Sequence, residues 1–435
     1  MITKLNFTNR TIKSYAIRKL TPKECFRLMG VRDNVIGTMQ SSNAQAAERV
    51  PDWKGKGKPE YMAVSASQQY KQAGNSICID VLAYLYQNLF YPTPKPRKQE
   101  QLSLFDDLDD TLPAIPPTAA NAAEEKIFLT TFSGYDSQLM AADVLREWHP
   151  DFRWTCKGWS DIDKYACQMH NLVFPQFADC ALGDITKIDW HAVKRSLQGR
   201  EVDLFTYSSP CQDISQAGKQ MGLQEGSDTR SALLWRVADA VEVLRPKYLL
   251  QENVAALVSQ KFMPDFQKWL DKLSSLGYVS CWARLNAKNY GVPQNRDRVF
   301  CISMRQDVAF DYQFPEPFEL TTRLEDVLEE EVADRYFLKD DAVSKFLKAN
   351  DSDNALFVQF DLPPTHEAAM FLKTWLTLRM NALNGWERKP DELKNCIENE
   401  REVLNSDFAS FSEYHTFPCE GFDELFKENM ERKKE

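Results

Sequence analysis

Apolar and polar positions alternate along residues 125–330 in a way that predicts strands and helices in turn. Segments of strand-like composition are followed by stretches with apolar residues at helical spacing. The strand-like segments have the usual strand length of about four to eight residues. The predicted strands are 126–132, 152–158, 202–207, 247–251, 278–285 and 298–303, and the predicted helices are 137–148, 163 onward and 230–243. This succession is typical of βαβ units and predicts an α/β fold with a doubly wound, Rossmann-like sheet.

The pattern before residue 91 is different. Residues 15–30 predict a helix with Thr21 as N-cap, Pro22 as its first residue and Gly30 at its end. Residues 31–65 are expected to form a polar, flexible insert that includes alternating Lys and Gly. Residues 68–90 predict a tight turn at 74–76 followed by an apolar helix.

A Pro-rich acidic stretch, residues 91–124, predicts a linker that is partly extended and disordered. An apolar island lies inside it. The island resembles the short peptide with which bacterial replication proteins dock on the sliding clamp; alternatively, it packs back on the body of the protein. Its residues are Gln101, Leu102, Ser103, Leu104 and Phe105.

Composition narrows the class of protein. The chain has 435 residues and no run of eighteen apolar ones, so neither a membrane span nor, given a polar start, a secretory signal is expected. Ten scattered cysteines without a C-x-x-C pair argue against zinc and against a disulfide framework, and fit a reducing cytoplasm. Residues 331–435 hold 14 Lys and Arg against 22 Asp and Glu, which accounts for −8 of the net charge of −10. The rest of the chain is nearly neutral and can still focus positive potential in one cleft.

Candidate chemistry gathers where the predicted strands end. Cys211 follows the 202–207 strand, at the edge where open α/β sheets bind ligands. Position alone leaves two interpretations open: an ordinary buried cysteine, or a nucleophile whose thiolate a following helix could favour. Asp161, Asp184 and Glu252 also follow strand-like runs, and a carboxylate after the second strand usually reaches a ribose hydroxyl.

Three sequence blocks occur together and in order: TYSSPCQDISQAGKQMG, then QENV, then NYGVPQNRDRVF. They resemble the DNA (cytosine-5) methyltransferases in content and spacing. RKLTPKECFRLMG and QQYKQAGNS are similar to the last two motifs of that family, but here they precede the first motif. The resemblance therefore implies a circularly permuted member of prokaryotic or phage type, with the Pro-rich stretch joining the old ends. It covers most of residues 15–90 and 125–335.

The resemblance implies a reaction with S-adenosyl-L-methionine as methyl donor. Cys211 would add to carbon 6 of a cytosine flipped out of double-stranded DNA, and Glu252 would hydrogen-bond the ring nitrogen 3 and the amino edge. Arg296 and Arg298, predicted on one strand and pointing the same way, would hold the base and its phosphate. The resemblance further implies that the loop is shaped by Pro210 and Asn253. No metal is expected.

For the methyl donor, the resemblance implies a first turn, a ribose ligand, an adenine face, an adenine amino ligand and a methionine end. These are, in that order, Phe132 with Gly134, Asp161, Ile162, Asp184, and Leu233 with Asn75 and Ser76. Two departures stand out. Asp136 replaces a common second glycine and is expected to narrow the approach to the turn, and Ile162 replaces an aromatic residue and is expected to weaken stacking.

The expected domains are a permuted segment 1–90 completing the catalytic domain, the linker 91–124, a catalytic core 125–330 and a mainly helical region 331–435. The last region is expected either to recognise the target sequence or to bind a protein, with the 31–65 insert sharing DNA contact. We expect a cytoplasmic monomer that methylates DNA sequence-specifically, in a restriction-modification system or as an orphan or phage enzyme. Two alternatives stay open: an inactive DNA- or partner-binding relative, and a tRNA cytosine methyltransferase.

Overall fold

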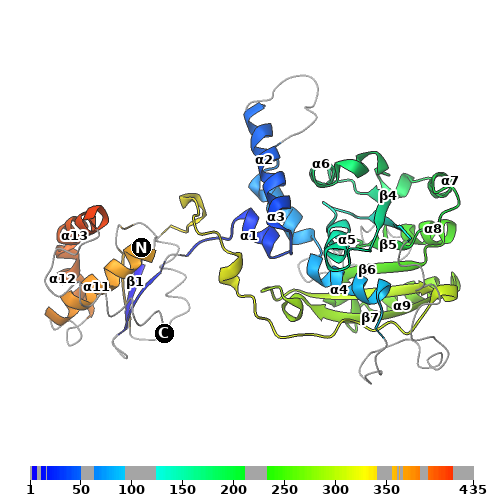
Figure 1. The fold of residues 1–435 in the computed structure, drawn as a ribbon. Coiled ribbons are helices and arrows are strands. Elements are labelled where there is room, and N and C mark those ends of the chain that lie inside the picture. The colour runs from blue at the N-terminus through cyan, green and yellow to red at the C-terminus, as the bar shows by residue number, and fades with distance from the viewer. Residues whose placement is uncertain are drawn as a thin grey trace. The chain divides into compact units, whose positions relative to one another are not determined.

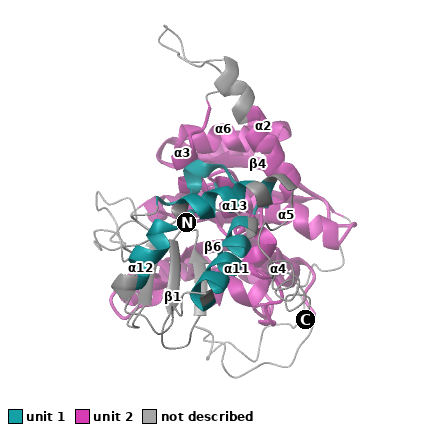
Figure 2. Cartoon of the chain, turned by 90° about the vertical axis from the view of Figure 1, so that its left-hand side faces the viewer, with its two compact units in different colours: residues 1–21, 329–435 teal, residues 22–328 magenta. Residues whose placement is uncertain are grey.

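The computed structural model describes residues 2–6, 11–15, 17–49, 63–93, 124–210, 233–339, 355–359, 362, 366–382 and 390–414. The chain divides into two compact units. Unit 1 comprises residues 1–21 and 329–435, and unit 2 comprises residues 22–328 (Figure 2). Each unit is built around its own sheet.

Unit 2 contains a six-stranded sheet in the order β4-β3-β5-β6-β8-β7 (Figure 1). Strands β3 to β6 are parallel, and β8 and β7 add antiparallel pairs at one side. The strands are β3 (Lys126–Thr131), β4 (Trp154–Ser160), β5 (Leu204–Tyr207), β6 (Tyr248–Val254), β7 (Tyr278–Asn286) and β8 (Asp297–Arg305). All six predicted strands are confirmed within a few residues of their expected bounds.

Helices cover both faces of this sheet, which confirms the α/β class. Residues of α4 (Ile79–Phe90), α5 (Ser137–Trp148) and α6 (Lys164–Val173) share one apolar core with one face. Residues of α7 (Trp190–Ser196), α8 (Trp235–Leu244) and α9 (Met263–Ser275) share a second core with the other face. The sheet and the helices on its two faces form three layers. The central strands are buried on both sides, as parallel strands usually are.

The connections place a topological switch point between β3 and β5. From β3 the chain crosses to β4 on one side and then returns to β5 on the other side of β3. Ligands of open α/β sheets bind beyond the carboxyl ends of the strands at such a point. The turn after β3 and the loop after β5 are therefore the places to examine for a site.

The described part of residues 22–93 adds to unit 2 the helices α1 (Pro22–Arg27), α2 (Asp33–Arg49), α3 (Ala66–Asn75) and α4. The prediction of a loop over 31–65 was wrong for residues 33–49. That segment holds alanine, glutamine and other helix formers without proline, although few of its positions are apolar. The predicted turn at 74–76 was also misplaced, since Gly74 and Asn75 end α3 and the link to α4 begins at Ser76.

Unit 1 is assembled from both ends of the chain. Strand β1 (Ile2–Asn6) pairs with β2 (Thr11–Tyr15) on one side and with β9 (Ala355–Gln359) on the other, all antiparallel. The backbone N–H of Lys19 donates to Tyr336 O at 2.9 Å, and that of Leu338 donates to Ile17 O at 2.8 Å. Residues 1–21 thus group with 329–435, whereas the sequence placed all of 1–90 with the catalytic core.

The described residues of unit 1 also form α11 (His366–Ala382), α12 (Pro390–Asn399) and α13 (Arg401–Tyr414). They share a small apolar core that includes Phe371, Trp375 and Leu393. The described part of residues 331–435 is thus mainly helical, as predicted, with β9 added. Among the described residues of both units, no helix is both long and apolar enough to cross a membrane.

Candidate active site

The turn after β3 has an unusual backbone. Phe132, Gly134 and Asp136 all have positive φ angles, of 54°, 59° and 69°. A Cβ built on Gly134 would have no described heavy atom within 4 Å beyond its chain neighbours. Such a bare, left-handed glycine at a switch point lets a ligand approach the backbone closely. Phe132, the other predicted turn residue, is half-buried against the second core.

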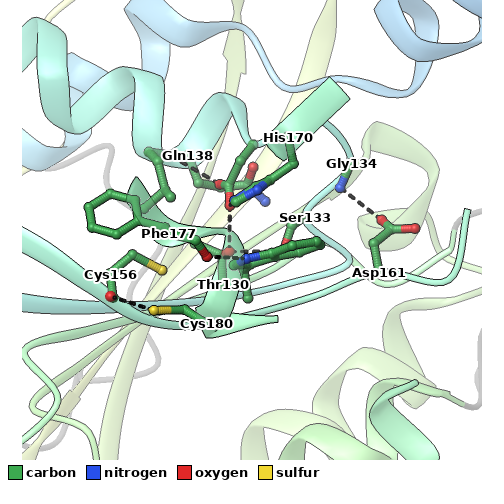
Figure 3. Close-up of polar contacts among 12 residues, drawn as sticks. Thr130, Ser133, Gly134, Gln138, Cys156, Asp161, His170, Phe177 and Cys180 are labelled. Carbon is green, nitrogen blue, oxygen red and sulfur yellow. Dashed lines mark hydrogen bonds and ion pairs between the residues drawn. The ribbon is translucent and has the colours of Figure 1, made fainter. Parts of the chain in front are cut away.

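Asp161 binds this turn from the end of β4. Its Oδ2 accepts a hydrogen bond from the Gly134 N–H at 2.8 Å, and its Oδ1 accepts one from the Asp163 N–H at 2.8 Å (Figure 3). Burial raises the pKa of Asp161, against the lowering effect of these bonds. The next side chain, Ile162, is 77% exposed, which is rare for an isoleucine. The predicted ribose ligand and adenine face are therefore adjacent, beside an open backbone.

Asp184 and Leu233 lie on neighbouring connections. Asp184 caps the short 3-10 helix Ile185–Lys187, where its Oδ1 accepts from the Thr186 N–H at 3.0 Å, and this bond holds the pKa of Asp184 below its usual value. The Ser160 hydroxyl donates to Gly183 O at 2.6 Å and so ties this connection to β4. Leu233 is half-buried and lies two residues before α8.

Glu252 and Arg298 form a cross-strand pair on β6 and β8. Arg298 Nε lies 3.0 Å from Glu252 Oε1, and Glu252 is only 7% exposed. Burial raises the pKa of Glu252, while Arg298 and then Arg296 oppose the shift. A carboxyl group held by a cation, with its proton stabilised by burial, is suited to give or share a proton with a bound base.

Arg296 differs from its prediction. β8 begins at Asp297, so Arg296 directly precedes the strand, and it has hydrogen-bond partners that Arg298 lacks. Its Nη2 instead donates to Gly74 O at 2.9 Å and to Ser76 O at 2.5 Å, at the end of α3. Arg296 therefore fastens the predicted methionine-end residues Asn75 (exposed) and Ser76 (buried) to the strand that carries Arg298. Burial lowers the pKa of Arg296, with Glu252 opposing.

Asn253 ties the end of β6 to the loop after β5. Its Nδ2 lies within hydrogen-bond distance of Ser209 O (3.3 Å) and Ser209 Oγ (3.4 Å), and its Oδ1 accepts from the Val254 N–H at 2.9 Å. Ser209 and Asn253 are both buried. The next residue, Pro210, is half-buried, and Cys211 lies outside the described residues. The structure thus fixes the stem of the cysteine loop against the strand that bears Glu252.

The prediction that the Asp136 side chain narrows the approach to the turn was wrong. Its side chain is fully buried instead of narrowing the approach to the turn. Its Oδ1 accepts from the Leu139 N–H and caps α5, and its Oδ2 accepts from the Thr130 hydroxyl. An Asp directly before a helix is a recognisable N-cap signal. Asp136 was interpreted only as the replacement of a glycine, so its capping role was not predicted. His170, buried beside it, carried no signal in the sequence.

These positions fit a nucleoside with a charged tail: a bare glycine turn, a carboxylate bound to it and an exposed apolar side chain lie together. Among the described residues, no group of three or more His, Cys, Asp or Glu is placed to hold a metal ion. The arrangement defines an α/β protein with a nucleotide-type turn next to a paired glutamate and arginine and the stem of a cysteine loop.

Comparison with known families identifies that class. The model of the family described as C-5 cytosine-specific DNA methylase matches residues 146–401, more than half of the chain. The chain belongs to this family.

Several curated relatives are similar over part of the chain. Type II methyltransferase M2.ScrFI from Lactococcus lactis subsp. cremoris is 40% identical over 209 residues, covering 48% of this chain and 54% of that protein. Orphan methyltransferase M.SssI from Spiroplasma monobiae is 48% identical over 114 residues, covering 25% and 29%. Type II methyltransferase M1.ScrFI, also from L. lactis, is 34% identical over 184 residues, covering 42% and 44%. The matches thus span about half or less of these relatives.

Proposed function

We propose that the protein is a sequence-specific DNA (cytosine-5-)-methyltransferase that uses S-adenosyl-L-methionine. The observation that carries the proposal is the Glu252–Arg298 pair next to the Asn253–Ser209 contact that anchors the cysteine loop. Family membership and the names of the relatives, all methyltransferases, support the same reaction.

The proposed roles follow from the chemistry of cytosine, whose carbon 5 is a poor nucleophile. The Cys211 thiolate adds to carbon 6, and Glu252 stabilises the charge that builds at nitrogen 3 by sharing its proton there. Carbon 5 then takes the methyl group that S-adenosylmethionine supplies. Removal of the proton from carbon 5 reforms the ring double bond and expels the thiolate. Arg298 keeps Glu252 in position, and Pro210 shapes the loop.

In the proposed cofactor site, Phe132 and Gly134 form the turn against which the donor lies. Asp161 accepts from the ribose hydroxyls and Ile162 covers the adenine, with Asp184 at its amino group. Leu233, Asn75 and Ser76 lie at the methionine end. The open space at Gly134 and the exposure of Ile162 support this assignment.

We further propose that the chain is circularly permuted. Residues 22–93 pack into unit 2 through α4 and α5, and Arg296 holds the end of α3, as expected if this segment supplies the family's final motifs from the other end of the chain. The target-recognition role is assigned to unit 1. We propose that the enzyme is cytoplasmic and monomeric. It would belong to a restriction-modification system or act as an orphan or phage enzyme. The clamp-like peptide at 101–105 lies outside the described residues and stays a prediction.

Conversion sequencing of DNA from a methylation-free bacterial host that expresses the chain tests the function. Protected cytosines within one short motif, absent with Cys211→Ala, are expected. RNA from the same cells should stay unmodified; modified RNA with unmodified DNA would establish the tRNA alternative. Folded protein that binds the methyl donor but protects no cytosine in either nucleic acid would support the inactive relative.

A further inference from the structure

The turn at 132–136 is held in a costly conformation. Two of its three left-handed residues, Phe132 and Asp136, are not glycine. A left-handed backbone is unfavourable for residues that carry a Cβ. Conformations of this kind persist where surrounding contacts over-determine them, commonly at ligand sites. The contacts that hold this turn are therefore informative about its use.

Asp136 supplies several of these contacts. Its carboxylate oxygens accept from the Leu139 N–H at 3.2 Å and from the Thr130 hydroxyl at 2.8 Å, and its own N–H donates to Ser133 O at 2.8 Å. Thr130 Oγ1 and Ser133 Oγ are also hydrogen-bonded, at 2.8 Å. The side chain thus links the last residues of β3, the turn and the first turn of α5.

His170 braces Asp136 from α6. Its Nε2 lies 3.3 Å from Asp136 Oδ2, and both side chains are 0% exposed. The imidazole stacks on the Trp159 ring with centroids 3.8 Å apart, and the Trp159 indole N–H donates to Phe177 O at 2.9 Å. In Figure 3 the Gly134–Asp161 contact lies on the right of the view, and His170 and Thr130 lie to the left of it.

The same turn is fixed to the end of β4. The Ser133 N–H donates to Ser160 O at 3.0 Å, and the Ser160 N–H donates to Ser133 Oγ at 3.2 Å. Asp161, which follows Ser160, accepts a hydrogen bond from the Gly134 N–H. The buried contacts of Asp136 and the part-buried contact of Gly134 with Asp161 therefore belong to one backbone turn, five residues long.

We propose that Asp136 and His170 are positioning residues for the nucleoside of the methyl donor. They hold the 132–136 turn so that the Gly134 N–H keeps the Asp161 carboxylate oriented beside Ile162. This inference rests on the proposed function. It reverses the expectation from sequence, in which Asp136 obstructs the donor.

Replacement by glycine separates the two interpretations. Asp136→Gly relaxes a left-handed position and removes any obstruction, but it leaves the Thr130 hydroxyl and the Leu139 N–H without this acceptor and removes the carboxylate that lies beside His170. We expect the dissociation constant for S-adenosylhomocysteine, measured by calorimetry on the full chain, to rise about tenfold or more, because the competent turn becomes a minor conformation. Asp136→Asn, which keeps a side-chain acceptor for the helix cap, should fold even if Asp136→Gly does not. It should raise the KM for the donor and keep kcat at saturating donor.

Asp203→Asn is the matched control. Asp203 is also buried, accepts the Ile127 N–H at 2.8 Å and pairs with Lys247 at 2.9 Å, but it lies at the amino ends of the strands, away from the turn. It should lower the melting temperature and leave donor affinity unchanged. His170→Leu should weaken donor binding in the same direction as the Asp136 variants.

Two outcomes would overturn the inference. In the first, Asp136→Gly and Asp136→Asn bind S-adenosylhomocysteine as tightly as the wild type, or more tightly. This result would show that the buried contacts of Asp136 do not contribute to donor binding. A wild-type protein that is folded and binds neither S-adenosylhomocysteine nor S-adenosylmethionine would refute the proposed function, and the positioning role with it.

Discussion

Two arginines in one short motif have different partners, and so different expected effects. Arg298 pairs with Glu252, whereas Arg296 donates to the carbonyl groups of Gly74 and Ser76. One guanidinium contacts the proposed base-binding carboxyl group and the other contacts the proposed donor-binding segment. The motif therefore connects the two halves of the site.

Arg296→Lys should loosen the donor-binding segment. Arg296 donates to both carbonyl groups through Nη2, and the lysine side chain is shorter, so its ammonium group reaches these two carbonyl groups less well. We expect a loss of about 1–3 kcal/mol in the free energy of unfolding, together with weaker S-adenosylhomocysteine binding. Arg298→Lys is the comparison variant, expected to lower turnover with donor affinity intact. Equal donor affinity in wild type and Arg296→Lys would refute the role given to this contact.

Glu252 should make stability depend on pH in a defined direction. Burial raises its pKa, so the folded protein keeps this proton to higher pH than the unfolded chain does. The folded state binds more protons there, and the contribution to stability is present at low pH and falls as pH rises through the raised pKa. Glutamine does not titrate. The melting temperature of Glu252→Gln relative to wild type should therefore increase from about pH 5 to about pH 8.

The control for this measurement is Glu147→Gln, because Glu147 is 60% exposed. Its melting temperature reports the effect of removing one exposed carboxylate, and the Glu252→Gln series is compared with it at each pH. A constant offset between Glu252→Gln and the wild type would contradict the effect assigned to burial.

At the scale of elements, the ends of β5 and β6 act together through Asn253. This side chain contacts the residue before Pro210 and lies next to Glu252 in sequence. A proposed nucleophile and a proposed acid reside on different strands, so their separation depends on what joins the two strand ends.

Asn253→Ala should therefore impair chemistry more than stability. We expect a loss of about 1 kcal/mol in unfolding free energy and a fall in single-turnover rate of about tenfold to a hundredfold, since the cysteine loop loses its anchor. Asn286→Ala removes a similar pair of contacts, to Asn295 at 2.7 Å and from the Lys288 N–H at 3.3 Å, at the end of β7. A rate for Asn253→Ala equal to that of Asn286→Ala would contradict the anchoring role.

The elements themselves show what could be predicted from sequence. Strands β3 to β8 and helix α5 were predictable, because buried apolar runs and amphipathic spacing are local signals. Helix α2 was not, because a polar helix has little apolar periodicity. The order of the strands and the antiparallel β7 and β8 depend on long-range pairing that no local pattern encodes.

Within the site, residue types in motifs were predictable and their partners were not. The motifs assigned Gly134, Asp161, Glu252 and Arg298 to one site, but they did not predict the Asp161–Gly134 and Glu252–Arg298 contacts. Arg296 donates to a carbonyl group at the end of α3, and Asp136 lies beside His170. Buried polar groups need partners, and only the folded chain determines which groups lie close enough to serve.

At the scale of the whole molecule, the two ends of the chain build one unit. β1 is hydrogen-bonded to both β2 and β9, so a unit assigned to target recognition depends on residues that the sequence placed with the catalytic core. The donor-site residues all belong to unit 2. Stability of unit 1 and donor binding should accordingly be separable.

Deletion of residues 1–16 tests this division. The deletion removes β1 and β2 and leaves β9 without the strand it pairs with, so protease should cut unit 1 faster than in the full chain. S-adenosylhomocysteine should still bind with an affinity within about twofold of the wild type, because the 132–136 turn, Asp161 and Arg296 keep their partners. Motif-specific protection of cytosines in the host should be lost. The comparison variant Asp203→Asn perturbs unit 2 and should leave cleavage of unit 1 unchanged. If the deletion abolished donor binding while unit 1 stayed resistant to protease, residues 1–16 would belong to the catalytic unit, as the sequence alone suggested.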